Sequence, residues 1–450
     1  MSKIITSIED PSLGGRSMPI TSKTAAPVDL SAEEKRVVHK AAWRIIPFAM
    51  FCLLLAFIDR TNIGFASLQM NEALNISPSV FGLAGGVFFV AYFLCEVPSN
   101  LALDRFGARL WLARIMVVWG VVATATAFVP GARSFLAMRF LLGAAEAGFF
   151  PGIILLITRW FPRSYRAQFI GWFTLAIPLS GVIGSPISAA LLAVPHWAGL
   201  ASWKWLFIIE GVPSILCGFA CLFIISDSPE KTRWLSREEV LTLQEALARD
   251  HAPAEQKAGF AAIMKTIFSG QVLLLALVLS GGAGVSAAYA VWLPRVVASY
   301  HWSVTQAGLL ISALYVLGSI AMLLFAKTSD RTRERRWHSA WPLLLAALCG
   351  PLLLVAHGFT LVYILLALAV IGIYACKGPT WAMATEYLPA QGKVASIAQV
   401  NALSNFTGFF TISITGIVFQ HSHSYAIAML PLGLLCAAAG VASLVAKPAK

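Results

Sequence analysis

The sequence is dominated by apolar stretches that are each about as long as a lipid bilayer is thick. The hydrocarbon core of a bilayer is about 30 Å thick, so a helix needs about 20 apolar residues to cross it. Because a backbone in lipid must satisfy its own hydrogen bonds, long apolar stretches predict helices. About twelve occur, at 44–70, 79–101, 109–129, 134–158, 167–192, 204–225, 270–298, 303–326, 338–356, 360–384, 394–418 and 424–446.

The composition supports an all-α membrane protein surrounded by lipid. Hydrophobic residues make up 58% of the chain and charged residues only 12%, whereas a soluble domain carries about 25% charged residues. The formal net charge is +12, but the excess lies in the loops, so it predicts orientation in a bilayer rather than a nucleic-acid partner. The seven cysteines lie in apolar segments without ligand-like spacing, which predicts packing roles and no metal site.

Lysine and arginine gather in every second connection between the apolar stretches. Arg105, Arg109 and Arg159 lie in even-numbered connections, and a basic run from 327 to 336 lies in another. The odd connections hold little beyond Arg133, Lys204 and Arg295. The positive-inside rule then places the even loops and both termini in the cytoplasm, with the protein in the inner (plasma) membrane. The polar first 30 residues lack the apolar core of a signal peptide, and Ser31 with Glu34 predicts a capped helix start.

A polar stretch divides the apolar stretches into six and six. We predict a cytoplasmic tail at 1–40, a six-helix bundle at 41–225, a cytoplasmic loop with an amphipathic helix at 226–269, and a second bundle at 270–450. Two motifs repeat at nearly one spacing, since Asp104 and Asp330 are 226 residues apart and Pro162 and Pro389 are 227 apart. Such a repeat predicts two bundles related by an axis along the membrane normal, with the substrate site between them near the midplane.

The motifs resemble those of the major facilitator superfamily. The loop Asp104–Arg109, its echo at Asp330–Arg335, and Arg139 with Gly143 carry this resemblance. Within the superfamily, Asp59–Ala66, Glu146–Gly152 and Gly378–Ala382 resemble the anion:cation symporter family. The resemblance implies a transporter of tartrate, sugar acids, phthalate or related carboxylates, not an enzyme, acting without a cofactor and predicted to be a monomer. Two motif positions depart from the pattern, Asn100 and Arg333, where glycine is expected.

Ionisable groups deep in a span cost about 2.5–3.5 kcal/mol to insert, so they mark candidate sites. Asp59 and Arg60 lie about 15 residues into the first span. Adjacent helix positions point about 100° apart, so the two side chains face different ways. The planar fork of Arg60 matches a carboxylate, which predicts a contact with the substrate anion. Asp59 is predicted to accept a proton or to pair with another helix, and a structural ion pair is the alternative for both.

Arg139 and Glu146 lie two turns apart on one face of the fourth span. A buried carboxyl whose proton affinity depends on its surroundings can load and release a proton, so we predict this role for Glu146. Arg139 could hold Glu146 ionised, and a buried salt bridge is the alternative for both. Lys377 precedes Gly378 and Pro379, where the proline predicts a kink. We predict Lys377 as a second anion contact, and the alternative is a lysine that reaches the cytoplasmic surface.

Neutral binding residues come from the resemblance. Family members place binding residues at positions matching Tyr92, Thr380, Trp381 and Asn405, whereas the residues alone would favour Asn401 and Gln399 nearly as well as Asn405. Hydrogen bonding between helices is the alternative for each. Charged residues at the helix ends are predicted to act as latches in gating, through ion pairs between helices; they are Asp104, Arg105, Arg109, Asp330 and Arg331.

The predicted function is proton-coupled import of a small organic acid by alternating access. Sodium coupling remains open, as does the choice among sugar acids, tartrate-like diacids and aromatic acids. An efflux antiporter of the same fold is an alternative, although 181–186 departs from the Gly-x-x-x-Gly-Pro run typical of exporters. A membrane sensor is a further alternative, but the short loops leave little room for a signalling domain. No cluster of nucleophile, base and metal ligands suggests an enzyme.

Overall fold

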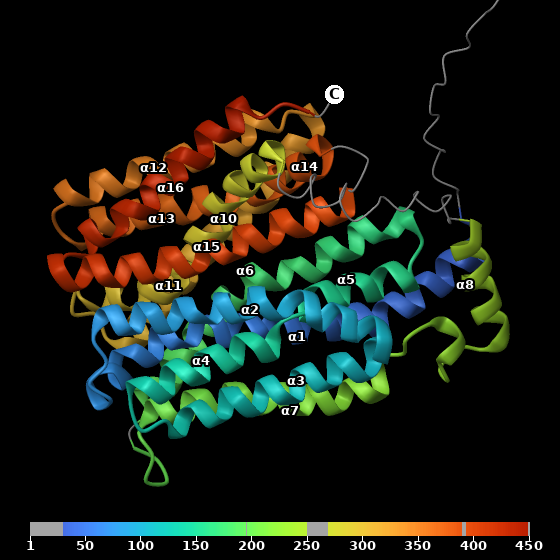
Figure 1. The fold of residues 1–450 in the computed structure, drawn as a ribbon, viewed down its shortest axis with the longest axis horizontal. Coiled ribbons are helices and arrows are strands. Elements are labelled where there is room, and N and C mark those ends of the chain that lie inside the picture. Colours follow the sequence, from blue (N-terminus) through green and yellow to red (C-terminus); the bar gives the residue numbers. More distant parts are fainter. Residues whose placement is uncertain (1–29, 195, 250–268, 389–392, 449–450) are drawn as a thin grey trace, which may run out of the picture.

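The computed structural model describes residues 30–194, 196–249, 269–388 and 393–448, and these residues form helices connected by short loops (Figure 1). Within the described residues, twelve helical segments are long and apolar enough to cross a membrane, as the sequence predicts. The helices are α1 (Ala32–Ala73), α2 (Pro78–Phe106), α3 (Ala108–Ala125), α4 (Ala132–Glu146), α5 (Phe149–Trp160), α6 (Arg163–Ala193), α7 (Ser202–Ile224), α8 (Arg237–Arg249), α10 (Gly270–Ala298), α11 (Val304–Thr332), α12 (Arg336–Val355), α13 (Phe359–Ala375), α14 (Lys377–Tyr387), α15 (Lys393–Ser422) and α16 (Tyr425–Val445).

Several helices extend beyond the apolar stretches into polar sequence. The first span is part of a 42-residue helix that begins at the predicted capping box. The Ser31 hydroxyl accepts a hydrogen bond from the Glu34 amide at 3.2 Å, and the Glu34 carboxylate accepts one from the Ser31 amide at 2.7 Å. Hydropathy marks only the part of a helix that lies in lipid, so it underestimates helices whose ends are solvated.

The fourth and tenth spans are each broken near the middle. The fourth span breaks at Gly148, whose φ of 89° lies in the left-handed region and whose Cα faces Ser99 so closely that a Cβ would collide with it. The tenth breaks between α13 and α14. Pro379 lacks the amide that would bond the carbonyl of Ala375, where α13 ends, which confirms the predicted kink. The fourth and tenth spans hold equivalent positions in the predicted repeat.

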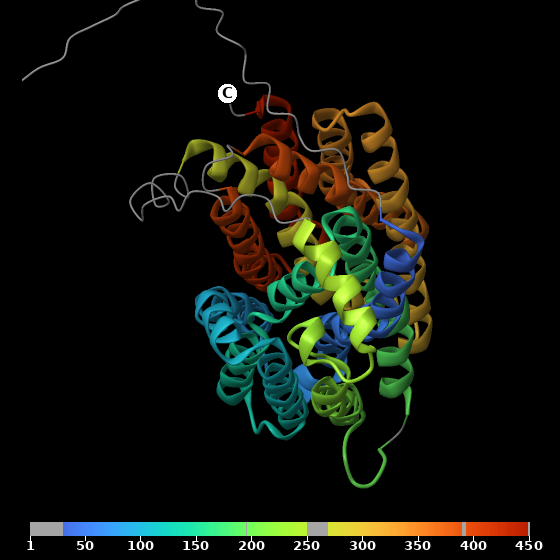
Figure 2. The same cartoon turned by 90° about the vertical axis from the view of Figure 1, so that its right-hand side faces the viewer.

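The helices pack as two halves that meet along three helix pairs. In the first half α3 packs on α7, α1 on α6 and α2 on α4, while in the second half α12 packs on α16 and α11 on α13. Between the halves α2 packs on α15, α6 on α11 and α1 on α10. Figures 1 and 2 show the first half, in blue and green, beside the second half, in yellow to red.

The two halves are locked together at the end of the bundle opposite α8, which we call the far end. The Ser312 hydroxyl donates to the Val182 carbonyl at 2.6 Å, and the Ser79 amide donates to the Gln420 side chain at 3.0 Å. Gly82 packs directly on the backbone of Ile412 and Gly416 in α15. These contacts close the far end between the halves.

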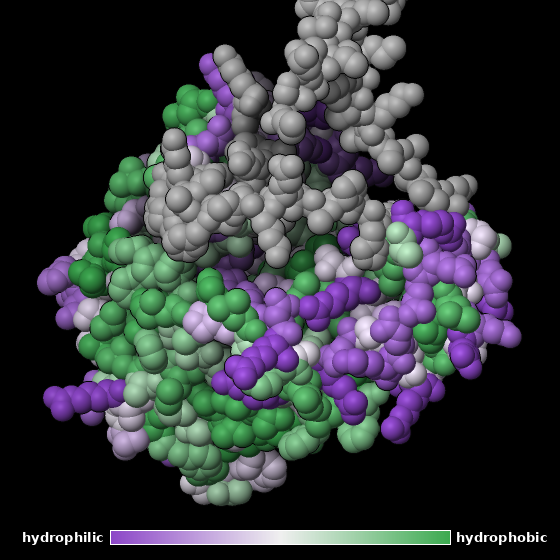
Figure 3. Space-filling view, turned by 45° about the vertical axis from the view of Figure 1, so that its right-hand side comes forward, coloured by the Kyte–Doolittle hydropathy of each residue, from purple (hydrophilic) through white to green (hydrophobic). Residues whose placement is uncertain are grey.

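The outer surface of the bundle is apolar, as expected for a protein in lipid. Large hydrophobic side chains are exposed on several helices, including Leu101, Phe223 and Leu434, which are 66%, 77% and 72% exposed. Hydrophilic residues gather instead around α8 (Figure 3). A soluble protein would bury such side chains, so this surface indicates contact with a bilayer.

The helix α8 is fastened to the first half. Lys40 forms an ion pair with Glu239 at 2.7 Å, and Arg249 pairs with Glu34. Trp234, in the loop before α8, stacks on Trp160 with centroids 5.6 Å apart. The amphipathic helix expected in the central connection is therefore present; α8 packs on α1, and the loop before it packs on α5.

The Lys40–Glu239 pair makes the attachment of α8 pH-dependent. The hydrogen bond from Lys40 lowers the pKa of Glu239, so this pair contributes stability above the unfolded pKa and loses it as pH falls through the folded pKa. Because the pair is partly exposed, we expect no more than about 1 kcal/mol. Glu239→Gln should therefore increase proteolysis near α8 severalfold at neutral pH, with little effect at low pH. Equal sensitivity of the two proteins at neutral pH would contradict this.

Candidate functional site

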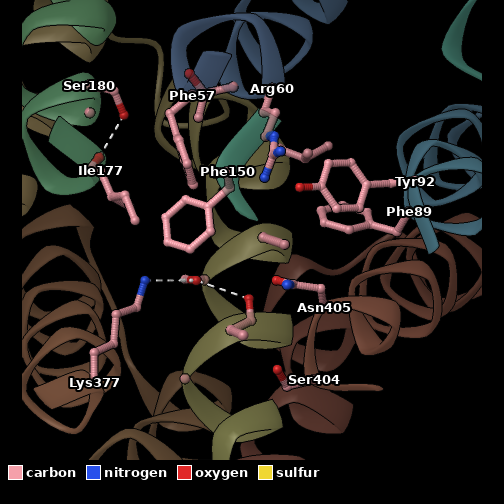
Figure 4. A pocket seen from close by; sticks show the side chains of 18 of the residues that line it. Phe57, Arg60, Phe89, Tyr92, Phe150, Ile177, Ser180, Lys377, Ser404 and Asn405 are labelled. Carbon is pink, nitrogen blue, oxygen red and sulfur yellow. Dashed lines mark hydrogen bonds between the residues drawn. The ribbon is translucent and has the colours of Figure 1, made fainter. Parts of the chain in front are cut away.

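A cavity of about 170 Å³ lies between the two halves near the breaks in the fourth and tenth spans. The first half lines it with aromatic side chains and two arginines, and the second half lines it with hydroxyl, amide and lysine side chains (Figure 4). The main lining residues are Phe57, Arg60, Phe88, Phe89, Tyr92, Arg139, Phe150, Ser286, Tyr315, Tyr374, Lys377, Thr380, Trp381, Asn401 and Asn405. An apolar cavity with a few polar groups is typical of a small-molecule site.

Arg60 and Glu146 form an ion pair at the wall of the cavity. Arg60 Nε and Nη2 lie 2.8 Å and 2.5 Å from Glu146 Oε1. The Arg60 side chain is 18% exposed and lines the cavity, whereas Glu146 is 1% exposed and lies behind it. The guanidinium also lies 4.7 Å, 5.2 Å and 5.1 Å from the ring centroids of Phe57, Phe88 and Tyr92. An anion entering the cavity would meet Arg60 in an aromatic surround that strengthens its electrostatic interactions.

The buried salt bridge between Arg139 and Glu146, which was the alternative interpretation, is not found among the described residues. Within the described residues Arg139 Nε and Nη1 have no hydrogen-bond partner, although the side chain is only 2% exposed. Its guanidinium lies 5.1 Å from the Phe88 ring and lines the cavity. The residue that holds Glu146 is Arg60, because the two facing helices α1 and α4 bring them together, which spacing along one helix cannot reveal.

Asp59 points away from the cavity, as its position next to Arg60 predicts. Its carboxylate accepts hydrogen bonds from Trp119 Nε1 at 2.5 Å and from Asn62 Nδ2 at 3.4 Å. It is 1% exposed and belongs to the packed interior of the first half. The alternative of a structural ion pair between helices does not hold for Asp59 among the described residues, since its hydrogen-bond partners are neutral.

Lys377 is the cationic group from the second half, and it points into the cavity rather than toward the membrane surface (Figure 4). It is the first residue of α14. Its Nζ lies 3.3 Å from the Ser286 hydroxyl and 4.2 Å from the centroid of the Tyr374 ring. No carboxylate among the described residues pairs with it. A free ammonium opposite Arg60 gives the cavity two positive walls.

The neutral residues expected to bind substrate also line the cavity. Tyr92 lies beside Arg60, and Asn405 donates to the Asn401 side chain at 3.1 Å. The Thr380 hydroxyl donates to the Lys377 carbonyl at 3.1 Å, and Trp381 is 37% exposed. The structure thus brings together every residue predicted to contact substrate.

The predicted gating residues lie at the α8 end, and Asp104 forms an ion pair between helices, of the kind expected. Asp104 pairs with Arg159 of α5 at 2.7 Å. Asp330 pairs with Arg335 at 2.6 Å, and Arg335 also pairs with Glu386 of α14 at 2.9 Å. These pairs connect helices within one half and do not cross between halves.

The neighbouring arginines of the first loop make separate contacts. Arg109 donates through Nε to the Leu222 carbonyl at 2.7 Å, and its amide donates to Asp227 at 2.9 Å. Arg105 lies 5.6 Å from the Phe106 ring. Asp104 and Asp330 thus pair with Arg159 and Arg335, two residues that were not among those predicted for gating.

Two buried carboxyl groups escaped the sequence analysis. Glu96 in α2 is 8% exposed and Glu210 in α7 is 5% exposed. Both lie within apolar stretches, so the insertion cost that singled out Asp59 and Glu146 applied to them as well. Glu96 is one turn from Tyr92 and interacts electrostatically with Arg60.

The cavity lies between two helical halves of membrane-spanning helices and has cations on both walls, an arrangement suited to a small anionic molecule. The major facilitator superfamily model matches residues 49–414, and the chain belongs to this superfamily of transporters, which are not enzymes. Two proposed tartrate transporters of Agrobacterium vitis are each 43% identical to it; one match covers 87% of this chain and 90% of the relative, and the other covers 87% of each. The metabolite transport protein NicT of Pseudomonas putida is 36% identical over 89% of this chain and 92% of its own.

Solved structures show the same fold. A bacterial homologue of the lysosomal transporter Spinster, in an inward-facing conformation, aligns with a TM-score of 0.75 at 16% identity, covering 93% of this chain and 98% of its own. A D-xylose–proton symporter aligns with a TM-score of 0.72 at 15% identity, covering 90% of this chain and 98% of its own. At these identities the likeness concerns the fold alone.

Proposed function

We propose that this protein imports a tartrate-like hydroxylated diacid by proton symport. The observation that carries the proposal is the pair of cationic walls, Arg60 from the first half and Lys377 from the second, facing one cavity. A diacid whose two carboxylates contact both groups would bridge the halves. Alcohol groups would find the hydroxyl and amide groups of Ser286, Asn401 and Asn405. The identity to proposed tartrate transporters supports this substrate class.

Proton coupling would follow from competition for Arg60. In the structure Glu146 accepts both hydrogen bonds of Arg60 through one oxygen. If Glu146 takes up a proton, it loses its negative charge and Arg60 becomes available for a substrate carboxylate. Substrate and proton therefore favour each other's binding, which is the requirement for symport.

The proposed direction of transport depends on the orientation of the protein in the membrane, which the loop charges predict. That orientation places the α8 end in the cytoplasm and the far end outside, in the inner membrane. Because the halves are locked at the far end, this structure would be closed to the outside. Alternating access would require opening the α2–α15 and α6–α11 contacts while the α8 end closes. The pairs Asp104–Arg159 and Asp330–Arg335 would keep each half rigid during this rocking motion.

A second candidate function is export of an organic compound. A quinolone resistance transporter of Acinetobacter baumannii is 35% identical over 84% of this chain and 87% of its own. The aromatic wall formed by Phe57, Phe88, Phe89 and Phe150 would suit a planar ring. The cationic walls, however, favour a substrate with two negative charges over a drug of mixed charge.

The test is uptake of labelled tartrate into proteoliposomes with an alkaline interior. We expect accumulation that a protonophore abolishes and that unlabelled diacids compete for better than monoacids. Accumulation driven by a sodium gradient at equal pH would contradict proton coupling. Quinolone movement that does not respond to tartrate would favour the exporter instead.

Replacement of Lys377 tests the second cationic wall. Lys377→Gln should weaken tartrate binding about 10- to 100-fold, because a hydrogen bond to a charged group is worth about 1.5–3 kcal/mol. The affinity for a monoacid of similar size should fall much less, since Arg60 would bind its single carboxylate. The matched control is Lys327→Gln, at an exposed position in α11. Equal losses for the diacid and the monoacid, measured by calorimetry, would argue against a bridging role.

A further inference from the structure

A buried polar cluster lies in the first half, separate from the cavity. We call it the α7 cluster; it consists of Asp59, Asn62, Trp119, Ser188 and Glu210, from α1, α3, α6 and α7. Trp119 and Asn62 donate to Asp59, and the Ser188 hydroxyl donates to Glu210 Oε1 at 2.7 Å. Asn62 and Asp59 also interact electrostatically with Glu210. The cluster therefore places two carboxyl groups, on α1 and α7, in one buried polar site.

The hydrogen bonding of the α7 cluster is incomplete. Glu210 Oε2 and Asn62 Oδ1 are buried and have no partner among the described residues, and Asn62 is 1% exposed. Both atoms are hydrogen-bond acceptors, so the α7 cluster has too few hydrogen-bond donors. The hydroxyls of Thr124 and Ser214 nearby are also without partners. They can turn to donate a hydrogen bond, but they cannot neutralise a charge.

The buried charges of the first half show that the α7 cluster lacks a neutralising positive charge. Among the described residues, the apolar membrane-spanning stretches of this half hold four buried carboxyls, on Asp59, Glu96, Glu146 and Glu210, but only two guanidinium groups in their interior, on Arg139 and on the partly exposed Arg60. Arg60 forms an ion pair with Glu146. The positive charge of Arg139 acts electrostatically on Glu146 and Asp59. Four ionised carboxylates would leave excess negative charge buried, at a cost of several kcal/mol.

Of these four carboxyls, Glu210 is the one with no cation beside it in the part of the chain that the structure describes. Its helix packs on α1, α3, α6 and the short 3₁₀ helix at Thr126–Phe128. From these elements Asp59 is the ionisable group that interacts with Glu210 in the described structure, while α3 contributes Trp119 and α6 contributes Ser188 to the cluster. The two carboxyls can avoid mutual repulsion by holding one proton between them, as coupled carboxyl pairs do.

We propose that Glu210 and Asp59 together hold one proton, so that the α7 cluster is a second proton-carrying site distinct from the Arg60–Glu146 pair. One group is then a carboxylic acid and the other a carboxylate. The proton comes from bulk water and returns to it, and no other bond changes. Because Asp59 precedes Arg60 on α1, a change of charge in the cluster acts directly on the helix that carries the anion contact. Glu210 acts through Asp59 and is therefore a positioning residue.

The protonation itself is tested without any substrate, on the purified full-length protein. Infrared difference spectra during a pH titration report the carbonyl stretch of protonated carboxyl groups. We expect a band in the wild type that persists at neutral pH and is lost in Glu210→Gln. Ser188→Ala removes a hydrogen bond but keeps the carboxyl, so it should shift the band without removing it. The Ser188→Ala variant therefore still tests the proposal if the Glu210→Gln protein does not fold. Glu386→Gln, at an exposed position, should leave the band unchanged.

Two results would overturn this proposal. The first is a neutral-pH band that is identical in the wild type and Glu210→Gln, with no shift in Ser188→Ala. The second is loss of the band when sodium is added at constant pH, together with thermal stabilisation, which would assign the cluster to a sodium ion.

The role in transport rests on the proton symport proposed above, and it has a separate readout. In proteoliposomes Glu210→Gln should carry one proton fewer per tartrate than the wild type. An unchanged proton count would overturn that role. If the wild type moves tartrate without protons while the infrared band behaves as expected, proton symport fails but protonation of the cluster stands.

Discussion

Glu146→Gln should abolish the accumulation of tartrate against a gradient while sparing exchange of tartrate across the membrane. Glutamine has nearly the shape of a protonated glutamate, so its carbonyl can still accept a hydrogen bond from Arg60. It cannot release a proton, so binding of substrate no longer depends on pH. The carrier would then equilibrate its substrate but could not concentrate it. The measurements are pH-driven uptake and counterflow exchange in proteoliposomes.

The matched control for this variant is Glu386→Gln, which changes an exposed carboxylate at the end of α14. It should retain both activities, although it removes the ion pair with Arg335. If Glu146→Gln still concentrates tartrate in response to a pH gradient, the proton assignment is wrong. If it loses exchange as well, Glu146 serves mainly to position Arg60.

Arg60→Lys should weaken tartrate binding by about 100-fold, even though it preserves the positive charge. The guanidinium offers a planar fork and lies among three aromatic rings, whereas an ammonium makes shorter-range contacts and is more strongly hydrated. Loss of a two-point contact with a carboxylate corresponds to about 3 kcal/mol. The dissociation constant, measured by calorimetry at a pH where Glu146 is protonated, provides the test.

Arg114→Lys is the control for this second prediction. Arg114 lies over the Trp111 ring with its guanidinium 4.6 Å from the centroid, and it does not line the cavity. Its replacement should leave tartrate affinity unchanged. Unchanged affinity in Arg60→Lys would show that any cation suffices there, which would remove the argument for bidentate recognition of a carboxylate.

Interactions along one helix were the part of the site most open to prediction from sequence. Asp59 and Arg60 had to diverge because adjacent residues on a helix point in different directions, and they do. Pro379 had to interrupt the tenth span because it lacks an amide hydrogen. By contrast, the ion pair of Glu146 with Arg60 was not predicted, because Arg139 on the same helix was the visible candidate and Arg60 lies on another helix, α1.

The gating residues show the same limit. An ion pair between helices was expected for Asp104, but the sequence could not name its partner, Arg159, which lies 55 residues away. The α7 cluster involves four helices, and nothing in the local sequence around Glu210 indicates that Asp59 lies nearby. The position of the Glu210 carboxyl within an apolar stretch was nevertheless a signal by which the residue could have been found.

The sequence by itself determined the lipid environment, the twelve spans and the kink in the tenth span, since these depend on hydropathy over about 20 residues and on the backbone chemistry of proline. It also identified which side chains would be costly to bury. The tertiary structure alone decided which charges meet, which of them face the cavity, and which carboxyls lack a cation. Those outcomes depend on how separate helices pack, and a pairing between helices leaves no periodic pattern in a single sequence.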